Sequence, residues 1–195
     1  MGRLTTFTHV TLDGVMQAPG RPDEDTRGKF GFGGWEVRYG DRVMAEVATE
    51  GMATNSALLF GRRTYEDFHG FWPNQPQPNP FSDVLDRSRK YVASTTLGEP
   101  LPWANSTLLP GDAGESVARL KAESDADIVV LGSGNLVRTL MWHRLIDEYV
   151  VLIHPLVLGT GQRLFDEGGP SADLRLDDTR ITTTGVIIAT YRPAD

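Results

Sequence analysis

Short apolar runs alternate along this chain with segments whose apolar residues recur at helical spacing. The β-type runs are rich in Val, Ile, Leu, Thr and aromatic residues, which favour strands; they are Arg3–Val10, Ala57–Phe60, Lys90–Ser94, Asp127–Leu131 and Glu148–His154. Helical spacing is found over Asp41–Met52, Arg62–His69, Glu115–Ser124 and Leu136–Leu145,. Two last strands, Leu174–Thr183 and Val186–Tyr191, flank a turn near Thr184-Gly185. The pattern predicts an α/β fold whose mostly parallel sheet has antiparallel edge strands.

Two segments interrupt this alternation. Asp13–Trp35 is dense in Gly and charged residues, which indicates a long loop,. Trp72–Pro80 carries four prolines, so the pattern predicts neither a helix nor a central strand there,. The strands on either side of this Pro-rich segment are too few for two independent cores. We therefore expect one domain over residues 1–195,.

Composition narrows the class of protein. The 195 residues carry a formal net charge of −7, which disfavours general binding to nucleic acid,. The absence of Cys excludes a thiol nucleophile, a disulfide framework and a Cys-ligated zinc,. The N-terminus has no apolar signal region, and no apolar run approaches the ~20 residues of a membrane span,. These features indicate a soluble cytoplasmic protein.

Two strand-to-helix junctions have a composition suited to anions. In the first, Gly61, Arg62, Arg63 and Thr64 follow the strand Ala57–Phe60. Cations are disfavoured at a helix start, so two arginines there suggest an anionic ligand. Alternatively, both arginines are solvated or paired with Glu66 and Asp67.

The second junction is Gly132-Ser133-Gly134-Asn135-Leu136, after the strand Asp127–Leu131. Small residues at a helix N-terminus allow backbone N–H groups to bind a pyrophosphate, although a tight turn capped by Ser133 or Asn135 explains them equally well. Val137 stands where a Rossmann fingerprint needs its third Gly,. Together, junctions 71 residues apart (Gly61 to Gly132) suggest a nucleotide cofactor with two separated phosphate groups.

Other catalytic machinery is sparse. The four histidines, His9, His69, His143 and His154, lack metal-site spacing, so we expect no metal, and His154 is expected to be a packed or edge histidine,. No hydrolase elbow or Walker motif occurs,.

Three acidic residues are candidate proton donors. Asp13 follows the first strand, where its commoner role is to cap a turn, and Glu46 lies beside the apolar face of the first helix,. Glu50, one turn after Glu46, is an equivalent candidate.

The motifs together resemble the dihydrofolate reductase superfamily, in particular the reductase domain of bacterial riboflavin-biosynthesis deaminase–reductase enzymes. The resemblance covers nearly the whole chain and rests on Leu12-Asp13-Gly14, Gly61–Glu66 (GRRTYE), Lys90–Leu97 (KYVASTTL), Val130–Gly134 (VLGSG) and, most specifically, Pro155–Phe165 (PLVLGTGQRLF). It implies a three-layer α/β/α sandwich around a mainly parallel eight-stranded mixed sheet with an antiparallel C-terminal edge, and bound NADPH.

Site residues follow from the matched motifs. The resemblance implies that Gly61, Arg62, Arg63 and Thr64 hold the adenosine-side phosphates and that Ser94 and Thr95 flank the adenine ribose. Gly132, Ser133, Gly134, Asn135 and Leu136 would bind the pyrophosphate. An Arg beside the ribose can pair with a 2′-phosphate, which favours NADPH over NADH.

The resemblance also sets the functional alternatives. A chain without Cys cannot supply the zinc deaminase half of the bifunctional enzymes, so a stand-alone reductase-like domain is expected,. The leading hypothesis is an NADPH-dependent reductase of a small heterocycle, resembling 5-amino-6-(5-phosphoribosylamino)uracil reductase. A dihydrofolate-type reductase is an alternative, although Asp41, Glu46 and Glu50 compete as the carboxylate that would protonate the pterin. Because no single proton donor can be assigned, a non-catalytic NADPH-binding sensor is a second alternative. A flavin-dependent oxidoreductase on the same scaffold is a third. Relatives of this branch look dimeric, so we expect a homodimer that uses the apolar Pro155–Phe165 segment or the C-terminal strand pair,.

Overall fold

The computed structural model describes residues 2–51 and 56–194. The strand order is β4-β3-β2-β5-β1-β6-β8-β7. The chain divides into two compact units, the first made of residues 1–5 and 52–146 and the second of residues 6–51 and 147–195.

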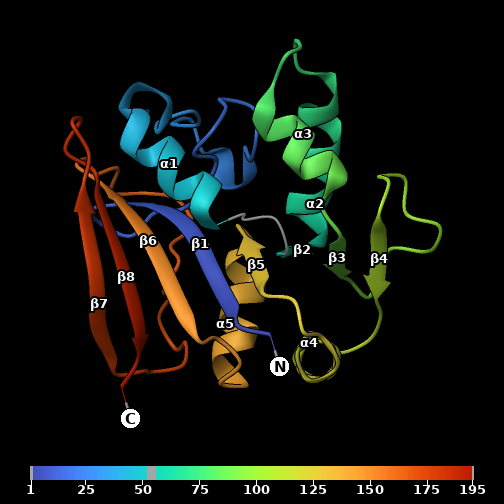
Figure 1. The fold of residues 1–195 in the computed structure, drawn as a ribbon. Helices are drawn as coiled ribbons and strands as arrows, with labels where there is room; N and C mark the ends of the chain where they lie inside the picture. The colour runs from blue at the N-terminus through green and yellow to red at the C-terminus, as the bar shows by residue number, and fades with distance from the viewer. Residues whose placement is uncertain (1, 52–55, 195) are drawn as a thin grey trace. The chain divides into compact units, whose positions relative to one another are not determined.

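The described residues of the first unit form four parallel strands, three of which the apolar runs predict. Strands β2 (Ala57–Gly61), β3 (Lys90–Ala93), β4 (Ser106–Leu109) and β5 (Ile128–Leu131) pair in parallel as β4-β3-β2-β5. Helices α2 (Arg62–Phe71), α3 (Pro80–Arg87), α4 (Ala113–Glu123) and α5 (Gly134–Trp142) connect or follow them (Figure 1). Because β2 and β5 are covered by helices, their residues form unbroken apolar runs with almost no exposure,.

Three elements of this unit were not anticipated. The prediction that Trp72–Pro80 holds no helix is wrong at both ends, because η3 (Trp72–Asn74) is a 3-10 helix and Pro80 begins α3. Asn79 caps α3 by accepting a hydrogen bond from the Ser82 N–H (3.1 Å), and a proline in the first turn has no N–H to leave unpaired,. Strand β4 is four residues long, too short for a periodic signal.

The second unit is built on antiparallel pairs. Strand β6 (Glu148–His154) pairs with β8 (Ile187–Pro193), and β8 pairs with β7 (Leu174–Ile181), as the C-terminal pattern predicts. Strand β1 (Leu4–Thr11) begins the sequence of elements, and short 3-10 helices η1 (Arg27–Lys29) and η2 (Val37–Tyr39) lie in the long loop (Figure 1). The apolar face of α1 (Arg42–Gly51) packs Val43, Met44 and Val47 against the β6–β8 core. Met52, the last predicted residue of that face, lies outside the described residues.

The predicted fold class is confirmed: the chain forms an eight-stranded mixed sheet with parallel strands and an antiparallel C-terminal edge. In the part of the chain that the structure describes, no helix is both long and apolar enough to cross a membrane.

Candidate functional site

The carboxyl ends of three parallel strands meet at one edge of the first unit. The register aligns Gly61 of β2 with Ala93 of β3, and Leu59 of β2 with Val130 of β5. The segments that follow these strands are therefore neighbours, and they carry the predicted cofactor residues at 61–64, 94–95 and 132–136. In parallel sheets this edge is where ligands bind.

Ser133 joins segment 132–136 to segment 61–64. Its Oγ accepts a hydrogen bond from the Gly61 N–H (3.1 Å) and lies 2.9 Å from Oγ1 of Thr64. A Cβ on Gly61 would come within 2.3 Å of this oxygen, so only glycine permits the approach. The two strand-to-helix junctions are therefore in direct contact through Ser133.

Two helices begin at this site without a side-chain cap. The first hydrogen bond of α5 runs from the Val137 N–H to the Ser133 carbonyl (3.0 Å), so the N–H groups of Gly134, Asn135 and Leu136 have no partner within the helix,. Neither Ser133 before α5 nor Gly61 before α2 supplies a side-chain bond to these groups. Unpaired N–H groups and the positive end of the helix dipole together favour an anion here.

The turn before α5 is left-handed at two successive residues. Gly132 has φ +60° and Ser133 has φ +61°. A Cβ on Gly132 would lie 3.2 Å from the Thr64 side chain, closer than most such contacts. This turn directs the Ser133 side chain toward β2. The first backbone N–H groups of α5 are then left to donate hydrogen bonds to an anion.

The charged and polar side chains at this edge differ in how they are engaged. Arg62 forms an ion pair with Glu66 one turn away (3.0 Å), which is one of the alternatives that the sequence left open. Arg63 is exposed and forms no ion pair with the other described residues. Ser94 accepts hydrogen bonds from the N–H groups of Thr96 and Leu97 (both 3.1 Å) and so fixes the turn after β3. The remaining predicted residues vary in exposure: Thr95 and Asn135 are exposed and Leu136 is buried.

Asp13 belongs to the second unit and is held by several donors. Its carboxylate accepts hydrogen bonds from the N–H groups of Gly159 (2.8 Å) and Leu158 (3.2 Å), from Thr11 Oγ1 (2.6 Å), and pairs with Arg163. Burial alone would raise its pKa, but these hydrogen bonds outweigh burial and lower the pKa to about 2,. The contacts favour the turn-capping role of Asp13 over proton donation.

The three competing carboxylates of the first helix are also engaged at the surface. Glu46 is exposed and pairs with Arg42 (3.2 Å), and Glu50 pairs with Arg180 (2.9 Å). Asp41 caps α1 through the Met44 N–H (2.9 Å) and binds Thr183. All three carboxylates are thus engaged in contacts of the helix surface rather than held in an enclosed pocket.

Aromatic residues of the long loop line a hollow in the second unit. The hollow has a volume of about 410 Å³ and is lined by Phe32, Gly34, Trp35, Val37, Arg38, Leu156 and Leu158. Trp35 is buried and donates its indole N–H to the Gln17 carbonyl (2.8 Å), while Phe32 remains half exposed. The mostly apolar walls and one exposed guanidinium suit a flat ring with an anionic substituent.

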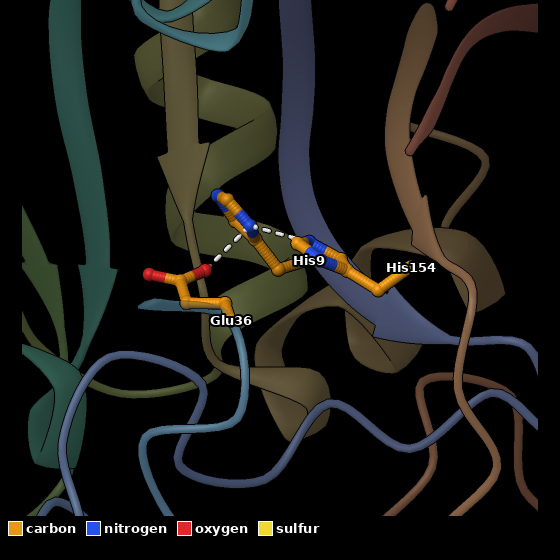
Figure 2. Close-up of side chains that lie close together, drawn as sticks. All are labelled: His9, Glu36 and His154. Carbon is orange, nitrogen blue, oxygen red and sulfur yellow. Dashed lines mark hydrogen bonds and ion pairs between the residues drawn. The ribbon is translucent and has the colours of Figure 1, made fainter. Parts of the chain in front are cut away.

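A titratable cluster that sequence reasoning missed lies in the same unit. Figure 2 shows His9 of β1, Glu36 of the loop and His154 of β6 pointing toward one another. Nδ1 of His9 lies 3.1 Å from Nε2 of His154 and 2.5 Å from Oε2 of Glu36. Because these residues are 27 and 118 positions apart in the chain (9 to 36, 36 to 154), no spacing could have revealed them.

Burial sets the protonation of this cluster. His154 has no exposed surface and burial, with the charge of His9, lowers its pKa to about 4 against the opposing effect of Glu36. Burial alone would raise the pKa of Glu36, but His9 and His154 lower it overall. At neutral pH the cluster therefore holds a neutral His154 and an ionised Glu36.

The described residues form an α/β fold in which α2 and α5 begin, without a side-chain cap, at the carboxyl ends of parallel strands. The chain belongs to the RibD C-terminal domain family, whose model matches residues 3–189.

Several known proteins are similar to this chain. The uncharacterized protein YyaP of Bacillus subtilis (strain 168) is 27% identical over 188 residues, which cover 93% of this chain and 90% of YyaP. A pyrimidine reductase-like protein from Corynebacterium diphtheriae has a TM-score of 0.68 at 12% identity, over 100% of this chain and 92% of that one. Dihydrofolate reductase from Enterococcus faecalis, solved with NADP(H), has a TM-score of 0.61 at 14% identity, over 100% and 98% of the two chains. These structures share the fold, which the resemblance to dihydrofolate reductases anticipates.

Proposed function

We propose that this protein is an NADPH-dependent reductase of a small heterocyclic substrate. Membership of the RibD C-terminal domain family supports a reductase-type function. The observation that carries the proposal is the contact by which Ser133 joins the β2–α2 and β5–α5 junctions, whose helices begin without a side-chain cap.

The residues of the first unit fit a dinucleotide phosphate. The N–H groups at the start of α5 would bind the pyrophosphate, and Gly61 would allow the close approach of the two junctions,. Arg63, which is exposed and has no described ion pair, would bind the 2′-phosphate, with Arg62 beside it,. When bound, NADPH supplies the hydride, and the chain supplies binding and orientation.

The substrate proposal rests on the hollow of the second unit. Trp35 and Phe32 offer aromatic surface to a flat ring, and Arg38 offers a cation to a phosphate or carboxylate,. This combination fits a phosphorylated pyrimidine such as 5-amino-6-(5-phosphoribosylamino)uracil.

A binding titration tests the cofactor assignment. NADPH and NADH are titrated separately while the fluorescence of the four tryptophans is followed. Replacing Arg63 with Ala should weaken NADPH binding about 10–100-fold, since a charge-assisted contact contributes about 1.5–3 kcal/mol. NADH affinity should change much less, because NADH lacks the 2′-phosphate.

The exposed Arg119 of α4 provides a matched control, since Arg119→Ala removes an equal charge elsewhere in the same unit. Equal losses for both cofactors in Arg63→Ala, or an equal loss in Arg119→Ala, would contradict the 2′-phosphate assignment. No binding of either cofactor to the unmodified protein would contradict the proposed function itself.

A second candidate is a non-catalytic NADPH-binding sensor. The exposed positions of Glu46 and Glu50 and the fully engaged carboxylate of Asp13 favour it, because a pterin reductase needs a positioned proton donor,. Tight NADPH binding without NADPH oxidation across pyrimidine and pterin substrates would support the sensor. Oxidation with dihydrofolate alone would support a dihydrofolate-type reductase.

A further inference from the structure

In the His9–Glu36–His154 cluster, two short contacts meet at one atom, Nδ1 of His9, which can carry only one proton. The contact between His9 Nδ1 and Glu36 Oε2 (2.5 Å) requires a proton on Nδ1 that points at the carboxylate,. The contact between His9 Nδ1 and His154 Nε2 (3.1 Å) requires either that same proton or a bare Nδ1 accepting from His154,. A neutral His9 cannot give each contact its own proton.

Charging His154 would not resolve the conflict. Its Nδ1 is buried and has no hydrogen-bond partner among the described residues, so a charged ring would bury an unpaired N–H,. Oε2 of Glu36 is also buried, and within the described part of the chain it accepts no hydrogen bond. A buried carboxylate oxygen and a buried imidazole nitrogen therefore converge on Nδ1 of His9 with one proton between them.

A divalent cation satisfies the same three atoms at once. Nδ1 of His9, Nε2 of His154 and a Glu36 oxygen all lie within 4.8 Å of one another. Ligands about 2.0–2.1 Å from a tetrahedral zinc ion lie roughly 3.3–3.4 Å apart, so a modest movement of the Glu36 side chain would complete the geometry. Metal ligation needs a neutral imidazole and an ionised carboxylate, and two imidazoles and one carboxylate converge here,.

The surroundings of the cluster are also suited to a metal. The rings of Trp35 and Tyr39 pack edge-on against His154, with centroid distances of 5.0 and 5.3 Å, and so fix its orientation. The side chains of His9 and Glu36 are 20% and 24% exposed, which gives an ion a path from solvent. Three protein ligands leave at least one coordination position open.

We propose that His9, Glu36 and His154 form a binding site for a divalent transition metal ion, of which zinc fits best. Two imidazole nitrogens and one carboxylate oxygen are a donor set that zinc takes in open, three-ligand sites. The proposal shares no residue with the proposed cofactor site and does not depend on the proposed reductase activity.

Direct metal binding tests the proposal on the full chain. After treatment with a chelator and its removal, the protein is titrated with Co²⁺ and then with Zn²⁺. We expect one equivalent of Co²⁺ to bind with visible d–d absorption bands and Zn²⁺ to displace it. Because zinc binds only the folded site, it should also raise the melting temperature.

The variants separate this site from other histidines. Glu36→Gln nearly preserves side-chain shape and should weaken Co²⁺ binding by at least the roughly 10–100-fold that loss of a supporting group costs. His154→Ala should abolish the absorption bands, and circular dichroism shows whether each variant is folded. His143→Ala is the matched control, because His143 forms a separate histidine–carboxylate contact with Asp112 (3.9 Å) and should leave binding unchanged.

Each other result overturns the proposal. Absence of Co²⁺ and Zn²⁺ binding by the unmodified protein would show that the cluster is a purely hydrogen-bonded group. Unchanged affinity in folded Glu36→Gln, or loss of binding in His143→Ala instead, would place any bound metal elsewhere.

Discussion

The contact between Gly61 and Ser133 gives a quantitative test of the strand-end site. Replacing Gly61 with Ala would put a Cβ 2.3 Å from Ser133 Oγ and 3.1 Å from Ser133 Cβ. Overpacking of this kind costs about 1–3 kcal/mol, and displacing Ser133 also removes its hydrogen bond from the Gly61 N–H, a loss of about 1 kcal/mol. We expect the free energy of unfolding to fall by about 2–4 kcal/mol and the melting temperature by about 4–16 °C.

A second substitution identifies the cause of this loss. Ser133→Gly removes both atoms that the new Cβ would meet, and glycine adopts the φ of +61° at this position without strain,. On its own, Ser133→Gly should change stability by no more than about 1 kcal/mol, because the lost hydrogen bonds are offset by relief of the left-handed conformation. In the double variant the clash is absent, so we expect it to be at least about 1 kcal/mol more stable than additivity predicts.

Urea denaturation followed by tryptophan fluorescence measures all four members of this cycle. Gly70→Ala in α2 is the matched control, because a Cβ there meets no atom within 4 Å, and alanine in a helix should stabilise by up to about 1 kcal/mol,. A loss below about 0.5 kcal/mol in Gly61→Ala, or strict additivity in the double variant, would refute the argument that these junctions are in direct contact.

Three further predictions concern other parts of the chain. Asp13→Asn should lower the free energy of unfolding by about 1–2 kcal/mol at pH 7. Because the folded-state pKa of Asp13 is lowered to about 2, this difference between the two proteins should shrink in urea titrations as the pH falls from about 4 toward 2,. A difference independent of pH would contradict this prediction. Lys90→Met should lower the free energy of unfolding by about 1–3 kcal/mol, because the buried Lys90 Nζ donates to the carbonyls of Leu85 (2.6 Å) and Ser88 (2.9 Å) near the end of α3; a loss within error in urea denaturation would exclude this role,. We also propose a homodimer that covers Ile181 of β7, which is 70% exposed in the single chain,. Ile181→Glu should then shift the sedimentation mass toward the 21.5 kDa of one chain, and a mass of 21.5 kDa for the unmodified protein would refute the dimer.

The sequence by itself determined most elements and the position of the cofactor candidates. Apolar runs such as Ala57–Phe60 and Glu148–His154 are strands because their residues are buried, and the apolar spacing of α1 matches the face that packs on β6 and β8. The Asn79-Pro80 start of α3 also had a local signal, which the density of prolines before it obscured,. Local propensity and periodicity act within about ten residues, so they define elements and strand-to-helix junctions well.

Only the tertiary structure decided which distant residues meet. Parallel pairing of β2 with β5 brings Ser133 to the Gly61 amide, so the two strand-to-helix junctions contact each other. The fold of the second unit likewise brings His9, Glu36 and His154 together, although each alone looks like an ordinary core or loop residue. Contacts across tens of residues depend on strand order and register, and these are fixed by burial of the whole sheet rather than by any local pattern.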